Sequence, residues 1–491
     1  MSSSPAREPV MDRALFLVAA VVILGIIMSI LDVTVVNVAL RTLAEEFHTS
    51  LTTIQWVATG YTLALATVIP LTGWAADRFG TKRIYMTSIV LFLSGSLLSA
   101  TAWSAESLIA FRVLQGLGGG MLMPAGMTIL TRTAGPQRVG RVMGLIGIPM
   151  LLGPILGPII GGFLVDNASW RWIFLINVPI GAVALVLAFR ILPRDVPQPA
   201  HRLDWLGLAL LSPGLAAIIY GLAQSNAAGG FGHPEVYGPA LAGFAAVGAF
   251  FVHAVRTPET ALIDTRLFRN RTYSASLVTQ SLAAIALFGG MLLMPLYLQI
   301  VRGESAMATG LLLAPQGLGA MITMPIAGKL TDRIGTGRIV PFGLVGVALA
   351  FLGLTQLGAD TSYWIVGANL FVLGLGMGAT MMPTFSGAIQ TLRRSAIARA
   401  TTTLNINQQV SASIGTAVLS VLLASHLDDA PRTPGSMADA FGTTFVVAFG
   451  LVLVALVVAT LLLPRIKPDA PVEDDELPVD SHGEELVPVL A

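Results

Sequence analysis

Two charged side chains lie inside apolar runs of the sequence. A charge in such a run costs free energy, and proton chemistry is one function that can require it. Asp32 lies in LDVTVVNVAL, and no charged residue occurs between Leu15 and Leu31; Arg112 lies in a second apolar run, RVLQGLGGG. A charge at the centre of an apolar helix costs about 2.5–3.5 kcal/mol on insertion scales, so each residue needs a compensating partner. Burial favours the neutral acid, whereas a nearby guanidinium favours the carboxylate. An Asp32–Arg112 pair therefore predicts an acid whose protonation changes with conformation; a static ion pair that fixes the helices is the alternative.

The composition indicates that these runs cross a membrane. The chain has 491 residues, of which 54% are hydrophobic and 11% charged, whereas soluble domains carry roughly a quarter charged residues. Mean hydropathy is +0.78. The absence of Cys excludes disulfides and thiolate metal sites, and the six scattered His predict no metal centre. The first apolar run has no small-residue cleavage site, so we interpret it as a retained span rather than a signal peptide.

The apolar stretches predict an all-α polytopic membrane protein with fourteen spans, since a helix needs about 20 apolar residues to cross a bilayer. The predicted spans are 15–39, 52–74, 85–104, 107–130, 140–163, 172–192, 204–223, 237–256, 274–299, 307–328, 338–357, 363–386, 397–424 and 441–463.

The basic residues test this count. With the N-terminus inside, 23 of the 28 Lys and Arg lie on the cytoplasmic side. Four lie outside, namely Arg41, Arg171, Arg302 and Arg432, and the last is Arg112, inside a span. This asymmetry is the positive-inside pattern, and it predicts that both termini are cytoplasmic.

An internal repeat predicts how the spans are grouped. GWAADRFGTKR (73–83) recurs as GKLTDRIGTGR (328–338), and GLGGGMLMP (116–124) is echoed by GLGMGATMMP (374–383). Offsets of 255 and 258 residues indicate a duplicated bundle. We predict a cytoplasmic N-terminus (1–14), a six-helix bundle (15–192), two linker helices (204–256), a second six-helix bundle (274–463) and a disordered acidic tail (464–491). Parallel repeats of six helices are typical of transporters with a central site between the halves.

Five motifs occur in order on the expected spans: LDVTVVNVAL, GWAADRFGTKR, RVLQGLGGG, GPILGPIIGG and WRWIFLINVPIG. In these the chain resembles the major facilitator superfamily, and within it the fourteen-span drug:proton antiporter family of multidrug exporters, over about residues 15–463. Arg41 stands where such proteins usually have Pro, and the GPxxG-type pattern is doubled. The second half also lacks the additional embedded acids that some members carry.

The cytoplasmic turn after the second span predicts a latch, meaning contacts that hold one conformation. Asp77 could meet the positive N-terminal end of a helix of the other half, and Gly80 permits a turn with positive φ. The alternative is that these charges only set topology. The candidate latch residues are Gly73, Asp77, Arg78, Gly80, Lys82 and Arg83, with Asp332 and Arg333 in the second copy.

The fifth span has a small-residue face in which Gly153, Gly157 and Gly161 recur at i, i+4 spacing, interleaved with Pro154 and Pro158. Such faces let helix backbones touch, and prolines bend a span where a gate could move. The resemblance implies that this pattern marks antiporters and thus export; helix packing alone is the alternative.

Polar and aromatic groups inside spans are the candidate substrate contacts, and the stretch TTTLNINQQVSAS (401–413) is expected to line a wet cavity. Broad apolar walls and 18 Met suit varied hydrophobic ligands. Each candidate could equally form a helix–helix hydrogen bond. They are Asn37, Gln55, Trp56, Tyr61, Gln115, Gln280, Tyr297, Gln316, Asn405, Asn407 and Gln408.

Together these features predict a proton-coupled antiporter that exports hydrophobic or amphipathic compounds from the cytoplasm by alternating access. No GxxxxGK[ST] signature occurs, so we expect no cofactor, only a proton gradient, and no enzyme activity. The expected partners are small hydrophobic substrates, protons and lipid of the plasma (inner) membrane, with no nucleic acid and with the monomer as the functional unit. The alternatives are a narrow exporter of one metabolite, antibiotic, siderophore or lipid, a passive channel, and a membrane enzyme or sensor.

Overall fold

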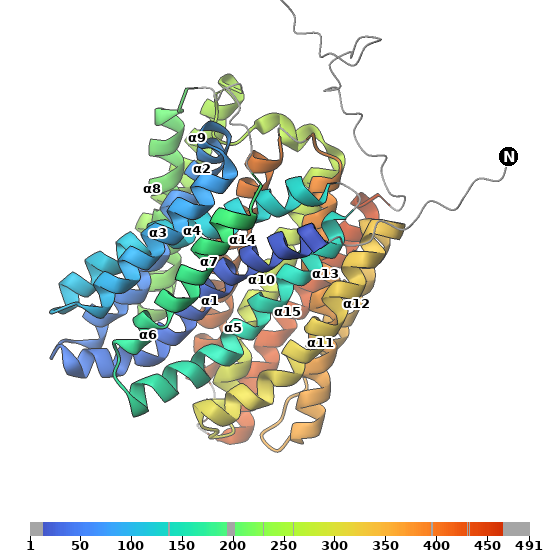
Figure 1. Cartoon of the computed structure of the whole chain (residues 1–491). Coiled ribbons are helices and arrows are strands. Elements are labelled where there is room, and N and C mark those ends of the chain that lie inside the picture. Colours follow the sequence, from blue (N-terminus) through green and yellow to red (C-terminus); the bar gives the residue numbers. More distant parts are fainter. Residues whose placement is uncertain are drawn as a thin grey trace, which may run out of the picture.

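The computed structural model describes residues 13–135, 138–193, 202–228, 230–258, 260–393, 396–429, 431 and 433–464, and within these ranges the chain is almost entirely helical (Figure 1). Thirteen helical segments of this described part are long and apolar enough to cross a membrane. Helix α5, Val139–Asn167, is the fourteenth of comparable length at 29 residues. The predicted all-α polytopic fold is confirmed. The predicted N-terminal segment and acidic tail lie outside the described residues, apart from a residue or two at each boundary.

The helices follow one another with short connections. Their bounds are α1 Arg13–Glu46, α2 Leu51–Phe79, α3 Thr81–Ala100, α4 Ala105–Ala134, α5 Val139–Asn167, α6 Trp172–Leu175, α7 Asn177–Ile191, α8 Trp205–Ala228, α9 Pro234–Arg256, the 3₁₀ turn η1 Thr265–Arg269, α10 Arg271–Ile300, α11 Ala306–Ile334, α12 Thr336–Leu354, α13 Tyr363–Gln390, α14 Ile397–Asp429 and α15 Pro434–Leu462.

Many helices extend past the predicted spans, because polar ends continue the helix beyond the apolar core. Helix α1 runs on to Glu46, through a turn in which Arg41 pairs with Glu45 at 3.1 Å. Side-chain caps fix several starts: Ser104 and Ser107 form a reciprocal capping box at α4, which satisfies backbone N–H groups that a helix start leaves free. The predicted sixth span is interrupted at Ile176, between α6 and α7.

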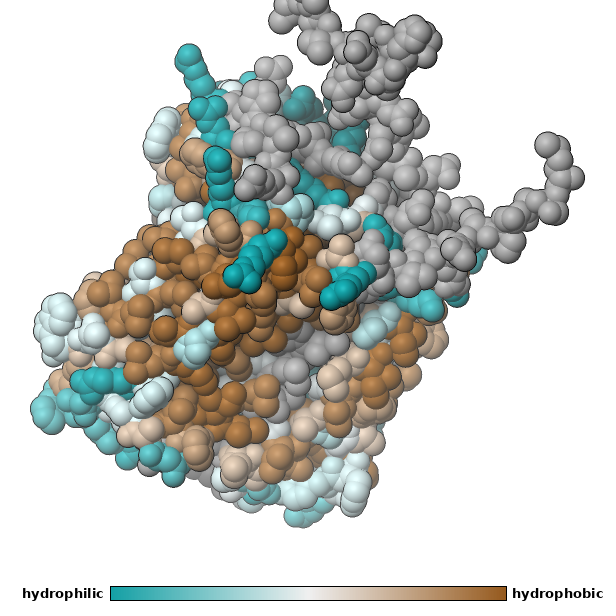
Figure 2. Space-filling view, viewed as in Figure 1, coloured by the Kyte–Doolittle hydropathy of each residue, from teal (hydrophilic) through white to brown (hydrophobic). Residues whose placement is uncertain are grey.

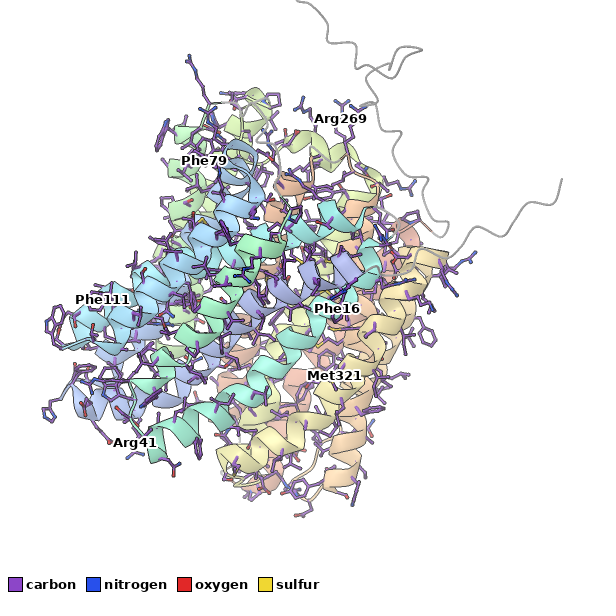
Figure 3. All side chains as sticks on the ribbon, in the orientation of Figure 1. Phe16, Arg41, Phe79, Phe111, Arg269 and Met321 are labelled. Atoms are coloured by element: carbon purple, nitrogen blue, oxygen red, sulfur yellow. The ribbon has the colours of Figure 1, made fainter. Side chains whose placement is uncertain are left out.

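The outer surface is apolar, as a lipid-facing surface must be. On the face in Figure 2, hydrophobic residues cover the middle, whereas hydrophilic residues gather toward the two ends. Large apolar side chains such as Phe163, Phe342 and Trp364 are strongly exposed on the surface of the molecule. Soluble proteins rarely expose so large an apolar surface to water, so this surface fits contact with lipid. Arg41 marks one end of the bundle, and Phe79 and Arg269 mark the opposite end (Figure 3). We call this second end the Asp77 end, because Asp77 precedes Phe79 by two residues.

Close helix pairs form within each repeat and also between them. In the first repeat α1 packs on α5, and α4 packs on α2 and α3; in the second, α13 packs on α11 and α12, and α10 on α14. Between the repeats α5 packs on α11 and α2 packs on α14. Equivalent turns follow α2 and α11, where Gly80 (φ 90°) and Gly335 (φ 86°) have the positive φ that favours glycine.

The two remaining long helices, α8 and α9, pack on each other, and α8 also packs on α2 and α14. One apolar cluster includes Ile69 of α2, Leu211 and Leu215 of α8, and Ile406 of α14. Helix α8 therefore covers the line along which α2 meets α14.

Because amphipathic tryptophan rings usually lie at the membrane surface, Trp170 and Trp172 of the motif WRWIFLINVPIG predict an anchor there. Trp172 is half exposed, which fits that interpretation, but Trp170 is only 4% exposed. Its ring packs edge-on against Phe47 and Phe174. Trp170 is thus a core residue that joins the end of α1 to α6.

Candidate functional site

The two charges singled out in the sequence form an ion pair. Asp32 of α1 and Arg112 of α4 are each 1% exposed, and Nη1 of Arg112 contacts Oδ2 of Asp32. Because each charge would be costly alone in an apolar bundle, their contact offsets both penalties.

Amide side chains complete the surroundings of this pair. Gln115 Nε2 donates to Asp32 Oδ1 at 2.8 Å and Asn177 Nδ2 donates to the same oxygen at 2.9 Å. Arg112 donates from Nη1 to Gln115 Oε1 at 2.8 Å and from Nε to the Val57 carbonyl oxygen at 3.2 Å. Four helices, α1, α2, α4 and α7, therefore meet at this buried ion pair.

Aromatic rings enclose the guanidinium group. Cζ of Arg112 lies 4.1 Å from the ring centroid of Tyr61 and 5.8 Å from that of Phe174, distances at which a ring face attracts a cation. The Tyr61 hydroxyl lies 3.1 Å from Oγ of Ser29. We call Asp32, Arg112, Gln115, Asn177 and Tyr61 the Asp32 network.

The glycines of RVLQGLGGG explain how the backbone permits this cluster. A Cβ added to Gly116 would lie 2.5 Å from the Tyr61 carbonyl oxygen, and one added to Gly95 of α3 would lie 2.6 Å from Cα of Gln115. Neither distance is possible for a real side chain. Helices α2 and α3 can therefore approach α4 closely enough for Tyr61 and Gln115 to reach the ion pair.

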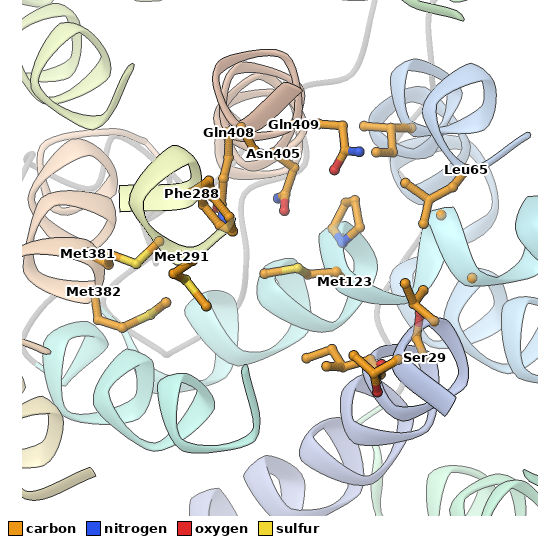
Figure 4. Close-up of a pocket in the computed structure, with 18 of the residues that line it drawn as sticks. Ser29, Leu65, Met123, Phe288, Met291, Met381, Met382, Asn405, Gln408 and Gln409 are labelled. Atoms are coloured by element: carbon orange, nitrogen blue, oxygen red, sulfur yellow. Dashed lines mark hydrogen bonds between the residues drawn. The ribbon is translucent and has the colours of Figure 1, made fainter. Parts of the chain in front are cut away.

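A cavity of about 330 Å³ lies beside the network, between the two repeats (Figure 4). Methionines and Phe288 occupy one side, the amides of α14 a second and Ser29 of α1 a third (Figure 4). The described residues that line it include no charged side chain. They are Ser29, Ile30, Val33, Thr34, Leu65, Ile69, Gly119, Gly120, Met123, Pro124, Phe288, Met291, Met324, Met377, Met381, Met382, Asn405, Gln408, Gln409 and Ala412.

Of the predicted substrate contacts, Asn405 and Gln408 line this cavity. Gln280 lines a small neighbouring cavity that Gln408 also borders. Gln115 and Tyr61 belong to the Asp32 network instead. The remaining predicted contacts lie as follows: Asn37 and Gln55 are exposed, Trp56 is exposed and stacks on Tyr220, Asn407 bonds with Ser281, Tyr297 donates to the Gly358 carbonyl, and Gln316 contacts the Met377 sulfur.

The first copy of the repeated turn holds α2 to α4 and α14. Asp77 accepts a hydrogen bond from Nη2 of Arg132 at 3.0 Å, and its Oδ2 lies 3.8 Å from Nε of Arg399, in the first turn of α14. A Cβ on Gly73 would lie 3.0 Å from Oγ1 of Thr402. Asp77 thus lies near a side-chain charge in the first turn of α14, whereas the prediction was a contact with the positive N-terminal end of a helix of the other half.

The second copy holds α11 to α5. Asp332 accepts the backbone N–H of Gly140 at 2.9 Å and that of Arg141 at 3.0 Å, at the start of α5. Nε2 of Gln390 donates to the same carboxylate at 3.0 Å. A carboxylate at a helix N-terminus is favourable because the free N–H groups carry partial positive charge.

The other candidate latch residues are more peripheral. Lys82 donates to the carbonyl oxygens of Phe189 and Leu192 at 2.8 and 2.7 Å, so it caps the end of α7. Arg78, Arg83 and Arg333 are exposed at the same end of the bundle.

The glycine face of α5 packs against α1. A Cβ added to Gly161 would lie 3.2 Å from Cα of Val35, and Cβ atoms added to Gly153 and Gly157 would lie closer still to Ile30 and Thr34. Thr34 donates to the Gly153 carbonyl oxygen at 3.2 Å. The side chains of Pro154 and Pro158 lie outside the described residues.

Several residues of these sites were missed in the sequence. Asn177 lies in the motif that was interpreted as an anchor. Arg132 and Arg399 were counted only as cytoplasmic charges, and Gln390 was not considered. Gln115 was predicted as a substrate contact, and its place in the ion-pair network could have been found from its spacing: it follows Arg112 by three residues, which places both side chains on one helix face.

The fold and this site define a polytopic membrane transporter. Residues 22–416 match the family profile of the Major Facilitator Superfamily. The chain belongs to the Major Facilitator Superfamily.

Similar proteins agree with the motifs. The chain is 49% identical over 416 residues to the multidrug resistance protein B homolog of Mycobacterium tuberculosis (strain ATCC 25618 / H37Rv), covering 84% of this chain and 77% of that protein. It is 34% identical over 410 residues to the methylenomycin A resistance protein of Bacillus subtilis (strain 168), covering 83% and 87%. The human organic anion transporter MFSD10 (TETRAN) shares the fold, with a TM-score of 0.64 at 17% identity, over 91% of this chain and all of that one. The predicted multidrug efflux family is confirmed.

Proposed function

We propose that the protein is a proton-coupled antiporter that exports hydrophobic or amphipathic compounds by alternating access. The observation that carries this proposal is the buried Asp32–Arg112 pair beside an uncharged cavity between the repeats. Ionisable residues inside membrane spans mark functional sites, and proton relays are one of their recurring roles. The names of the relatives refer to multidrug resistance and methylenomycin A resistance. These names support export as the direction of transport and drug-like compounds as the substrate class.

The arrangement in the membrane follows from the basic residues. We infer that the Asp77 end faces the cytoplasm, because that end carries most Lys and Arg. Both termini then lie on the cytoplasmic side of the plasma membrane. Residues 15–192 and 274–463 act as the two moving bundles and residues 204–256 as the linker pair. The functional unit is the monomer, and the proton gradient supplies the energy for transport without a cofactor.

The cycle uses the two Asp contacts as latches. Both are formed at the Asp77 end, so this arrangement corresponds to closure toward the cytoplasm. A proton from outside neutralises Asp32, weakens its hold on Arg112 and favours release of the substrate. After the bundles rock, loss of the proton to the cytoplasm restores the ion pair and prepares the cavity for the next substrate.

The cavity supports a preference among substrates. Thioether and aliphatic walls repack around varied shapes, and amides of α14 offer hydrogen bonds without charge. Neutral or monovalent compounds are therefore the expected substrates.

Everted membrane vesicles test the proposal directly. Native protein is expected to accumulate a lipophilic dye only with an imposed proton gradient, and Asp32→Asn is expected to lose uphill transport at every pH. Asp360→Asn neutralises an exposed acid and serves as the matched control. Uphill transport by Asp32→Asn with its pH dependence intact would refute proton coupling through this acid.

A narrow exporter is the second candidate, since one relative is named for resistance to a single antibiotic. The same vesicles separate the two functions. Transport of several unrelated dyes supports multidrug export, whereas transport of one compound from a structurally diverse panel supports the narrow function.

A further inference from the structure

We propose that Tyr61 is the positioning residue through which the protonation state of Asp32 acts on the central cavity; this inference rests on the proposed antiport. Asp32 and Arg112 are each 1% exposed, and neither is among the described residues that line the cavity. A substrate in this cavity therefore does not touch the carboxylate. Coupling requires a side chain that contacts both places.

Tyr61 makes both contacts. Its ring faces the guanidinium group of Arg112, with Cζ 4.1 Å from the ring centroid. Its hydroxyl lies 3.1 Å from Oγ of Ser29, which lines the cavity. The hydroxyl also abuts Gly119, a second lining residue, where a Cβ would collide with it. The tyrosine thus extends from the ion pair to the cavity wall.

The physical link is the position of the guanidinium group. While Asp32 is ionised, the carboxylate and the Gln115 amide hold Arg112. Once Asp32 is neutral, Arg112 loses its counter-charge, and the Gln115 amide oxygen, the ring of Tyr61 and the Val57 carbonyl remain as its partners. The ring then moves with the cation, and the hydroxyl changes its contact with Ser29.

The reverse effect follows from linkage. A substrate that displaces Ser29 or presses on the wall at Gly119 shifts Tyr61 and, through it, Arg112. If protonation weakens substrate binding, substrate binding must favour loss of the proton by the same factor. The exchange of substrate for proton then needs no direct contact between them.

Few other groups can act on this acid. Helix α1 packs on α2, α4, α5, α6 and α7. Among the described residues of these helices, Arg112 and Tyr61 are the charged or titratable groups that face Asp32, while α6 and α7 contribute Phe174 and Asn177. Helix α5 faces α1 with glycines, and its charged residues, Arg141 and Asp166, lie at its two ends in the sequence.

The test measures how pH changes substrate affinity in purified full-length protein. The probe is rhodamine 6G, a fluorescent lipophilic monocation, and the dissociation constant is read by fluorescence polarisation from pH 5.5 to 8.5. In the native protein we expect affinity to weaken by about tenfold at low pH, within the usual range of coupling. Tyr61→Phe keeps the ring over Arg112 but loses the hydroxyl, and Ser29→Ala removes its partner.

In both variants the ratio of the dissociation constants at pH 5.5 and pH 8.5 is expected to fall to less than about threefold, whatever the absolute affinity at pH 8.5. Tyr85→Phe is the matched control, because the hydroxyl of this equally buried tyrosine donates to the carbonyls of Val21 and Val22 instead. It should keep the native response. A full response in either Tyr61→Phe or Ser29→Ala would overturn the inference. A native protein without any pH response would instead contradict the proposed proton coupling itself.

Discussion

Asp332 and Gly140 join the two repeats: the carboxylate accepts the Gly140 N–H at 2.9 Å, at the first turn of α5. Asp77, the equivalent residue of the first repeat, uses the guanidinium groups of Arg132 and Arg399 instead. The same motif therefore closes one end of the molecule in two ways, once by a helix terminus and once by side-chain charge.

Asp332→Asn should loosen this closure without changing its shape. Loss of the charge at the start of α5 is expected to cost about 1–2 kcal/mol, which shifts the balance toward an open Asp77 end by about tenfold. Spin labels on Phe79→Cys and Ile334→Cys, both exposed, report the distance across that end, and the chain has no native Cys to interfere. A larger population at long distances is expected. Asp360→Asn is the control, and an unchanged distance distribution in Asp332→Asn would contradict the latch.

Gly144→Ala should act on the same closure by steric means. A Cβ at this position would lie 2.6 Å from the Met324 carbonyl oxygen of α11, and such overpacking typically costs about 1–3 kcal/mol. We expect transport to fall at least fivefold and the same spin-label distance to lengthen. Gly162→Ala, also on α5, meets no atom within 4 Å and should behave as native. Equal effects of the two substitutions would rule out a specific α5–α11 contact.

The ion pair predicts a non-additive pattern of stability. Arg112→Met leaves Asp32 buried without its counter-charge and should destabilise the protein by about 3–5 kcal/mol. Adding Asp32→Asn removes that unpaired charge, so the double variant should recover most of the loss. The melting temperature of detergent-purified protein measures both effects. Uphill transport should stay absent in the double variant. If the double variant were no more stable than Arg112→Met, the unpaired charge of Asp32 would not be the cause of the destabilisation.

The uncharged cavity predicts selectivity by charge. In everted vesicles, native protein should transport the monocation ethidium at least about tenfold faster than the related dication propidium, because a difference of 1.4 kcal/mol is tenfold. Gln408→Glu places a carboxylate on the cavity wall and should narrow that ratio. Gln356→Glu, at an exposed site, is the matched control. Equal rates for the two dyes in the native protein would show that cavity charge does not set the preference.

The sequence predicted the spans and the ion pair well, for physical reasons. Lipid demands about 20 apolar residues for each span, and Asp32 and Arg112 were conspicuous because a charge is expensive inside such runs. The break at Ile176 was not predictable from hydropathy, because apolar residues flank it on both sides and both α6 and α7 suit the same environment.

Neutral polar residues were harder to assign. Asn177 and Gln115 cost less to bury than a charge, and their amides suit a cavity wall, a helix contact or a carboxylate equally. Only the packing of α7 and α4 around α1 decides that both donate to Asp32. Trp170 shows the same limit: hydropathy alone does not distinguish a ring at the membrane surface from one enclosed by Phe47 and Phe174.

The packing of α8 on both α2 and α14 has a consequence for how compounds enter. Ile69, Leu215 and Ile406 meet there in one apolar cluster, so acyl chains of the bilayer are kept away from the seam between these helices. For the proposed export, we therefore expect that a compound dissolved in the membrane does not enter the protein between α2 and α14.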